Sequence, residues 1–224
     1  MLRPKKKITK RDIERDPFLD SVDKAQSHFE QNRSSYMKGA LLVTSGLLAF
    51  NLISNRQGQL DVDSSALLGQ ALITLGTEDV TTAKFQLETV INDYENTPSA
   101  SIAAYYLGKM NFDSGMKEES KTYLKKYIDD EPSGFLTASA TIMLADVLSS
   151  EEKLDEALNL MDNAIRKCDS KKDIRTLKIR KAQIELNRGN DEAARVLIND
   201  VLNDDNITAW NKQIAQEIIG KIKS

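Results

Sequence analysis

The stretch of sequence that decides the fold is residues 107–132, which read LGKMNFDSGMKEESKTYLKKYIDDEP. A Leu-Gly pair opens it, and a small residue follows twelve positions after the glycine. Two apolar residues come next, at intervals of four and three, and a proline stands five further on. These residues are, in order, Leu107, Gly108, Ser120, Leu124, Tyr127 and Pro132. Apolar residues three and four apart share one face of a helix, and a proline favours a helix end before it. The stretch therefore predicts two helices joined by a turn, the second ending ahead of Pro132.

The same intervals recur further along the chain. The next copy opens at Leu144-Ala145. A later copy has its turn at Gly189-Asn190 and places Ala182 in the small position of its first helix. The second helices of these two copies carry Ala157, Met161 and Ala164, and then Ala194, Ile198 and Val201.

An earlier, weaker copy opens at Leu68-Gly69. The residues that match its second helix are Ala83, Leu87 and Val90. Its turn, at residues 76–79, is longer than the pattern requires, so we interpret this copy as a degenerate repeat.

Helix–turn–helix units that recur at about 34 residues, with small residues where their two helices cross, are typical of tetratricopeptide repeats (TPRs). Gly108 and Ala145 are 37 residues apart, and two nearly complete registers at that offset rarely arise by chance. The sequence therefore predicts an all-α fold in which residues 60–224 form a TPR-like solenoid of about four helical hairpins.

The C-terminal residues 208–223 follow the last copy and have a helical pattern of their own. The apolar residues at helical spacing are Ile207, Trp210, Ile214 and Ile218. We expect a capping helix that covers the last repeat, with Trp210 packed beneath it.

An apolar segment at residues 36–54 precedes the repeats. It carries no charge from Gly39 to Phe50, and Tyr36 and Lys38 stand at its start. About 17 residues is the shortest helical span of a membrane, and this segment meets that limit. It begins too far from residue 1 for a cleavable signal peptide. We therefore expect a single transmembrane helix.

The head, residues 1–35, is basic and contains an amphipathic stem. Residues 1–38 hold ten Lys and Arg against six acids, a balance of +4, so the remainder of this −3 chain sums to −7. Asp16-Pro17 is a helix start signal, and the stem's apolar residues are Phe18, Val22, Ala25 and Phe29. The stem is either solvated or docks on a membrane partner. Basic residues favour the cytoplasmic side, so the head is expected in the cytoplasm and the repeats outside it.

Candidate binding residues lie on the first helices of the repeats, which line the concave groove of a TPR array. They are Tyr105, Lys109, Phe112, Ile142, Asp146 and Gln183. Aromatic side chains beside a cation suit the grip on an extended peptide or a partner helix. The alternative is that half of the groove residues belong to the core between repeats.

The residue inventory argues against an enzyme. Cys168 is the only cysteine and His28 the only histidine, so neither a Cys/His site nor a metal-ligand cluster is expected. No Gly-rich phosphate loop appears, and we expect no cofactor and no small-molecule substrate. The acidic body argues against nucleic acid as a partner.

The order of these parts resembles a known family. Residues 29–33, Phe-Glu-Gln-Asn-Arg, form a Phe-x-x-Asn-like stretch that leads directly into the apolar segment. Around residues 29–49, and in overall layout, the chain resembles the YfgM-like family of ancillary subunits of the bacterial Sec translocon. The resemblance implies a periplasmic TPR domain on the inner membrane that contacts translocon subunits, chaperones and exported clients, and it implies no catalytic residues.

These observations together predict a membrane-anchored adaptor at a secretion or envelope site. Within that class, an outer-membrane or cell-division scaffold is the rival. The alternative class is a membrane-tethered regulator whose basic cytoplasmic head binds a response factor or nucleic acid.

Overall fold

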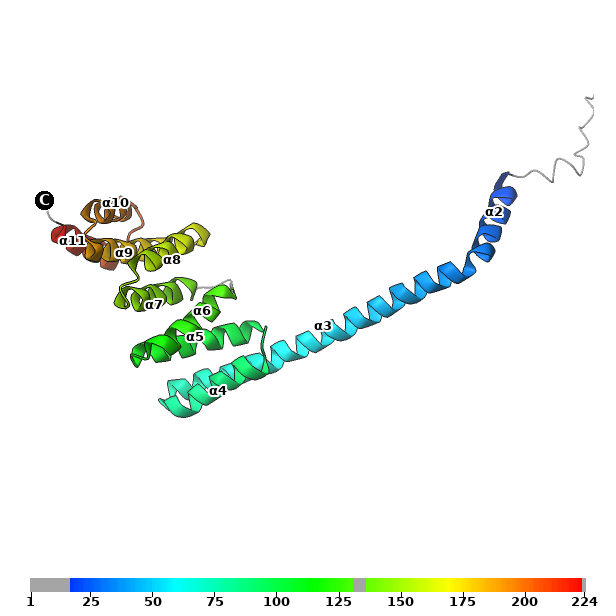
Figure 1. Cartoon of the computed structure of the whole chain (residues 1–224), viewed down its shortest axis with the longest axis horizontal. Helices are drawn as coiled ribbons and strands as arrows, with labels where there is room; N and C mark the ends of the chain where they lie inside the picture. The colour runs from blue at the N-terminus through cyan, green and yellow to red at the C-terminus, as the bar shows by residue number, and fades with distance from the viewer. Residues whose placement is uncertain (1–16, 131–135, 223–224) are drawn as a thin grey trace, which may run out of the picture. The chain divides into compact units, whose positions relative to one another are not determined.

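The structure, a computed structural model, describes residues 17–130 and 136–222 and is all-α over these residues. The helices are α2 (Pro17–Gln31), α3 (Arg33–Gly76), α4 (Val80–Asp93), α5 (Pro98–Asp113), α6 (Lys117–Asp129), α7 (Thr137–Ser150), α8 (Leu154–Lys167), α9 (Lys171–Arg188), α10 (Asp191–Leu202) and α11 (Ala209–Lys221) (Figure 1). The basic residues 1–16 and Pro132 lie outside the described residues, and so does the side chain of Phe18.

The chain divides into two compact units, residues 1–58 and 59–224. The division falls inside α3, which has 44 residues and runs without a break through the apolar segment into the first helix of the repeats. No proline interrupts residues 55–60, and a single glycine does not end a helix. By length and apolar composition α3 could cross a membrane, and no part of its most apolar window is buried.

In the first unit, α2 begins at Pro17 and ends at Gln31, and a single residue separates it from the start of α3. Asn32 stands between the two helices, and its side-chain amide donates to the carbonyl oxygen of His28 at 3.0 Å. The ring of Phe29 stacks on that of Tyr36, with centroids 5.4 Å apart. The stem is therefore a separate short helix.

The second unit is an array of helical hairpins. Within its described residues, α5 pairs with α6, α7 with α8, and α9 with α10. The C-terminal part of α3 shares a core cluster with α4. Figure 1 shows the hairpins following one another from α4 to α11. Each hairpin also packs on the next one, as a TPR-like solenoid requires.

The repeat period of the array is 37 residues, and the turns show it most plainly. One residue in each hairpin turn has a positive φ: Glu78 (63°), Gly115 (73°), Glu152 (62°) and Gly189 (85°). Consecutive members of this series are 37 positions apart. In the last three turns, the residue after the left-handed one donates its backbone N–H to a carbonyl five residues back, at 2.8, 3.0 and 2.9 Å. These bonds satisfy carbonyls at the end of the first helix.

The structure corrects the register of the first repeat. Ala71, which is fully buried, lies 37 residues before Gly108, whereas Gly69 lies 39 before it. A Cβ on Gly108 would lie 2.7 Å from Leu124 Cγ, but a Cβ on Gly69 would meet nothing within 4 Å. The crossing residue is therefore Ala71, and the opening at Leu68-Gly69 was wrong. With Ala71 in place, the turn has the same length as the others.

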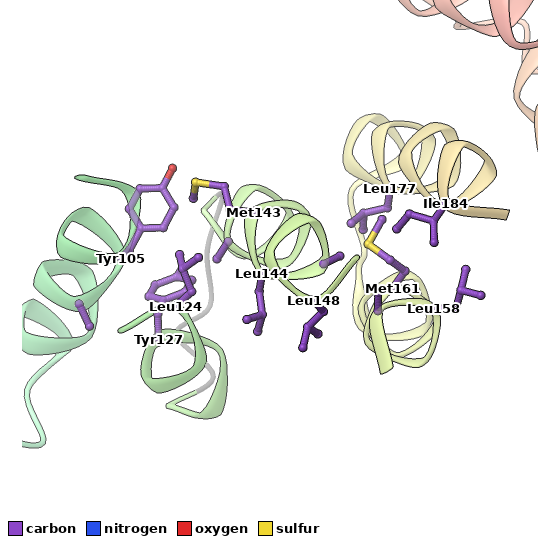
Figure 2. Packing of buried hydrophobic residues seen from close by; sticks show 14 residues of the cluster. Tyr105, Leu124, Tyr127, Met143, Leu144, Leu148, Leu158, Met161, Leu177 and Ile184 are labelled. Carbon is purple, nitrogen blue, oxygen red and sulfur yellow. The ribbon is translucent and has the colours of Figure 1, made fainter. Parts of the chain in front are cut away.

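The core runs between hairpins as well as within them. Figure 2 shows one cluster of buried side chains that connects α5 and α6 to α7, and then α7 to α8 and α9. Its larger members are Tyr105, Leu124, Tyr127, Met143, Leu144, Leu148, Leu158, Met161, Leu177 and Ile184. No hairpin buries its apolar faces alone, so each repeat depends on its neighbours.

The C-terminal helix α11 caps the array by packing on α9 and α10. Its buried residues are Asn211, Ala215 and Ile218, and Ile222, which directly follows the helix, is buried as well. Trp210 is 68% exposed, so the prediction that it packs under the cap was wrong. The buried face follows residues 211, 215, 218 and 222, and Trp210 lies one position, about 100° of helix rotation, away from that face.

Candidate functional site

The first helices of successive repeats are joined by hydrogen bonds between residues 34 positions apart. Ser65 and Ser99 hydroxyls join α3 to α5 at 3.1 Å, and the Tyr105 hydroxyl meets Ser139 Oγ on α7 at 3.0 Å. A third bond joins α7 to α9, from Arg180 to Asp146. The repeat period is 37 residues. A partner 34 residues further on therefore lies about one helical turn before the equivalent position on the next first helix. The first helices therefore form one continuous surface.

We define the first-helix surface by six residues of α5, α7 and α9. They are Lys109, Phe112, Ile142, Asp146, Arg180 and Gln183. Five were predicted from the sequence, and Arg180 was not. The sequence feature that could have indicated Arg180 is its position 34 residues after the acidic Asp146. That spacing can be interpreted only once the structure has shown the repeat period.

The predicted apolar residues serve mainly to pack repeats together. Tyr105 is 5% exposed, its ring contacts that of Tyr127 with centroids 5.5 Å apart, and it does not line the accessible surface. Phe112 and Ile142 are partly buried and pack against the central core cluster. The apolar candidates therefore belong to the core between repeats, which is what the alternative expected for half of the groove residues.

The predicted polar residues form the accessible part of the surface. Lys109, Asp146 and Gln183 occupy the same position in three repeats, 37 residues apart. Lys109 is exposed and its ammonium pairs with Asp113 at 2.6 Å. Arg180 lies between the other two: its Nε donates to Asp146 Oδ1 at 2.6 Å and its Nη1 donates to Gln183 Oε1 at 2.7 Å.

Asp146 is the electrostatically unusual group of this surface. Its burial raises the pKa of the carboxyl above the ordinary value, and the hydrogen bond and charge of Arg180 act in the opposite direction without cancelling that effect. A carboxylate held in this way is a directed hydrogen-bond acceptor beside a fixed cation, which suits polar groups of a peptide backbone.

A pocket of about 250 Å³ adjoins Asp146. Its lining residues are Phe112, Gly115, Lys117, Asp146, Val147 and Ser150. Phe112 and Val147 supply apolar wall, and Lys117 and Asp146 supply charges of opposite sign. The volume is smaller than the range typical of small-molecule sites, about 300–1,000 Å³. It suits a single side chain of a bound polypeptide, anchored next to polar groups.

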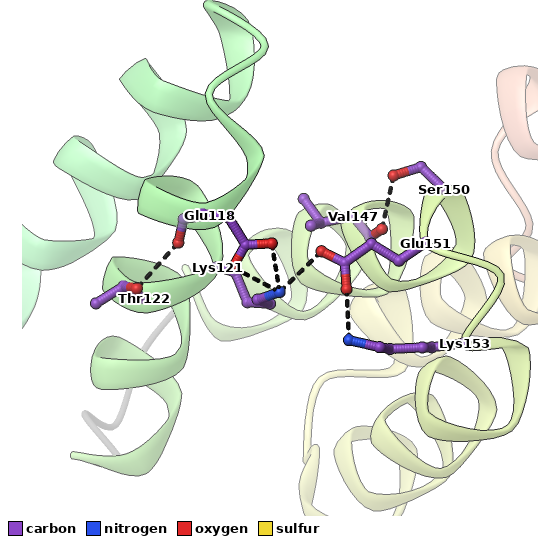
Figure 3. A network of polar contacts seen from close by, with 7 residues as sticks. All are labelled: Glu118, Lys121, Thr122, Val147, Ser150, Glu151 and Lys153. Atoms are coloured by element: carbon purple, nitrogen blue, oxygen red, sulfur yellow. Dashed lines mark hydrogen bonds and ion pairs between the residues drawn. The ribbon is translucent and has the colours of Figure 1, made fainter.

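A second polar network ties α6 to the end of α7 (Figure 3). Lys121 Nζ lies 2.8 Å from a carboxylate oxygen of Glu151, and Lys153 Nζ lies 2.8 Å from the other. Glu118 also pairs with Lys121, at 2.9 Å. The hydrogen bonds from Lys121 and Lys153 lower the pKa of Glu151 to about 2. This network joins two repeats, and we assign it a structural role.

Potential metal ligands and the single cysteine bear on whether the described residues could carry out chemistry. Residues 17–130 and 136–222 contain no group of three or more His, Cys, Asp or Glu side chains that could hold a metal ion. Cys168, half-buried at the end of α8, has its Sγ 3.6 Å from the carbonyl oxygen of Ser170. The arrangement suits contact with a polypeptide.

Comparison with protein families gives one match. A family model described as a tetratricopeptide repeat-like domain matches residues 26–169. The match begins within α2, includes the apolar segment of α3, and ends just after α8. No match is found among curated proteins. The 37-residue register continues through α9 and α10, beyond the matched region.

Proposed function

The chain belongs to the tetratricopeptide repeat-like domain family, and from this premise we propose that it is a membrane-anchored adaptor that binds protein partners through its first-helix surface. Domains of this kind are generally non-catalytic scaffolds that bind other proteins. The accessible polar row, Lys109, Asp146, Arg180 and Gln183, is the part of the array that a partner would contact.

The observation that carries the anchor is the exposure of the apolar part of α3. Its large side chains stand 62–71% exposed from Leu41 to Leu48, and Phe50 is 72% exposed. Exposing so many neighbouring apolar side chains to water is unfavourable in free energy, and burying them in lipid removes this free-energy cost. In the proposal, residues 36–54 cross the membrane. The family match supports this reading, because it takes in this segment together with the repeats.

The proposed orientation follows the charges that flank this segment. Lys24 and Arg33 precede it, Lys38 stands at its start, and Arg56 is the only basic residue after it until Lys84. By the positive-inside rule the head is then cytoplasmic and the array lies on the other side. The proposed location is the bacterial inner membrane, with the array in the periplasm.

The proposed partners are translocon subunits, chaperones or newly exported proteins. This finer assignment depends on the resemblance of residues 29–49 and of the overall layout to the YfgM-like family. The geometry of the first-helix surface is compatible with it, because an extended segment of an exported protein offers the backbone and side-chain groups that the surface can bind.

Photo-crosslinking in living cells tests the proposal. Lys109 is the site for the photoreactive residue, because its side chain is 46% exposed whereas Tyr105 is buried. A probe at Thr122, exposed on α6, is the control for non-specific capture. We expect translocon or chaperone subunits in the Lys109 adducts alone. Adducts of cytosolic proteins only would overturn the orientation and the proposed role.

A further inference from the structure

An apolar face of α3 remains uncovered at the start of the array. It consists of Val62, Ala66, Gly69 and Ile73, which lie at intervals of four, three and four and so share one side of the helix. Val62 and Ile73 are each 64% exposed, and Ala66 is exposed as well. A Cβ on Gly69 would meet no atom within 4 Å. We call these four residues the leading face.

The residues equivalent to Ala66 and Ile73 in later repeats are buried, with the exception of the partly buried Met110. The counterparts of Ala66 at 37-residue intervals are Ala103, Ala140 and Leu177, which are 0, 0 and 1% exposed. The counterparts of Ile73 include Val147 and Ile184, each 2% exposed. In later repeats these positions pack against the preceding repeat. The leading face is the corresponding surface of the first repeat, and the described residues contain no repeat before it.

Four of these buried counterparts share a core cluster with the second helix of the preceding repeat. Ala103 shares a core cluster with Leu87 and Val90 of α4. Ala140 shares one with Leu124 and Tyr127 of α6, and Leu177 and Ile184 share it with Leu158 and Met161 of α8. The covering helices have one pattern in common: apolar residues at a first, fourth and fifth position. These sets are Leu87, Val90 and Ile91; Leu124, Tyr127 and Ile128; and Met161, Ala164 and Ile165.

The internal repeats thus specify the shape and chemistry of what fits the leading face. We propose that the leading face binds an amphipathic helix of a partner protein that takes the place of a missing second helix. This helix carries apolar residues at its first, fourth and fifth positions. It runs antiparallel to α3, because the short links from α4 to α5 and from α8 to α9 make a second helix antiparallel to the first helix that follows it.

A second copy of the chain fits this geometry less well. Two copies anchored in one membrane through α3 would place their α3 helices parallel to each other. Stacking of one array onto the end of another is blocked, because α11 already covers α9 and α10. The binding of a further second helix depends only on the repeat register and not on the first-helix surface, whereas the first argument against a second copy rests on the proposed membrane anchor.

Peptide binding to the full-length protein in detergent micelles tests the proposal. The probe is a fluorescent, helix-stapled peptide with the sequence of residues 117–129, which contains the Leu124, Tyr127 and Ile128 set. The control peptide has alanine at those three positions. Fluorescence anisotropy reports the dissociation constant, and circular dichroism verifies that each variant is folded.

Two matched variants locate the binding site. Ile73→Asp places a charge on the leading face. Phe85→Asp changes a side chain that is equally exposed, at 69%, but its counterparts Thr122, Asn159 and Val196 are exposed in every repeat. We expect Ile73→Asp to weaken binding of the probe at least about tenfold, or about 1.4 kcal/mol, because the substitution removes an apolar contact and places a charge in the interface. Phe85→Asp should change it less than about twofold, well under 1 kcal/mol.

Three results would overturn the proposal. The first is a probe peptide that shows no saturable binding, or that binds no more tightly than the alanine peptide. The second is an equal effect of the two substitutions, which would place the probe elsewhere on the array. The third is a dimer of the protein that Ile73→Asp dissociates, seen by light scattering, which would assign the leading face to a second copy.

Discussion

Asp146 on α7 and Arg180 on α9 lie 34 residues apart in the sequence, and Arg180 Nε donates a hydrogen bond of 2.6 Å to the Asp146 carboxylate. The same bond fixes a polar group on the first-helix surface and joins two repeats. The proposed binding surface and the packing between repeats are therefore not separable in this array.

The first prediction concerns that pair. In Arg180→Met the pKa of Asp146 should rise further above its ordinary value, because burial still disfavours the charged form and its opposing partner is gone. Carbon-13 NMR titration of labelled aspartates measures this shift. Lys178→Met is the control, since Lys178 pairs with Asp200. An Asp146 pKa that stays the same in both variants would show that Arg180 does not stabilise the carboxylate.

The second prediction tests the repeat register with two glycines. Gly108→Ala should lower the free energy of unfolding by about 1–3 kcal/mol, because the new Cβ would lie 2.7 Å from Leu124 Cγ and 3.0 Å from the Leu124 backbone nitrogen. Gly69→Ala should raise it by about 0.5–1 kcal/mol, because alanine favours the helix and the site is open. Urea unfolding measures both. The reverse ranking would restore Gly69 as the crossing residue.

The third prediction concerns the left-handed turn residues. Glu152, at φ 62°, occupies the position that Gly189 occupies in the next hairpin turn, 37 residues further on. Glu152→Gly should raise the free energy of unfolding by about 0.5–1 kcal/mol, and Gly189→Ala should lower it by about 1 kcal/mol. Denaturation midpoints report both changes. A lower midpoint for Glu152→Gly would mean that the glutamate side chain contributes more than the backbone strain costs.

The fourth prediction concerns pH. The pKa of Glu151 is about 2 in the folded protein and has an ordinary value of 4.5, so the folded state binds the proton less readily. Its contribution to stability is therefore present above pH 4.5 and is lost as the pH falls toward 2. Glu151→Gln should be less stable than the wild type near neutral pH and should lose less stability between pH 5 and 2. Urea midpoints at each pH provide the comparison, and parallel curves for the two proteins would contradict it.

Much of the array could be predicted from the residues. Small and apolar residues at fixed intervals located the second helices correctly, and Gly189 marked its turn, because core packing and left-handed turns each restrict which residues fit. The first repeat was misplaced because Leu68-Gly69 resembles Leu107-Gly108 locally. Only burial, which places Ala71 inside and leaves Gly69 open, distinguishes the two registers.

Other features depended on contacts that a pattern does not contain. Trp210 shares helical spacing with Ile214 and Ile218, and the register of α11 against α9 and α10 leaves the indole exposed. Arg180 became a site residue only through its contact with Asp146, 34 residues away. Likewise, the change of composition after residue 54 suggested a boundary, but composition does not end a helix, and α3 runs on to Gly76.

Extraction of membranes with alkaline carbonate tests the central claim, that residues 36–54 hold a protein-binding helical array to a bilayer. Carbonate releases peripheral proteins and leaves transmembrane ones in the pellet. The account predicts that the full-length protein stays in the pellet and that a variant with Leu42, Leu47 and Leu48 changed to Asp appears in the supernatant, because charges at the centre of a span are costly. Release of the unaltered protein into the supernatant would contradict the anchor, and with it the proposed location and role.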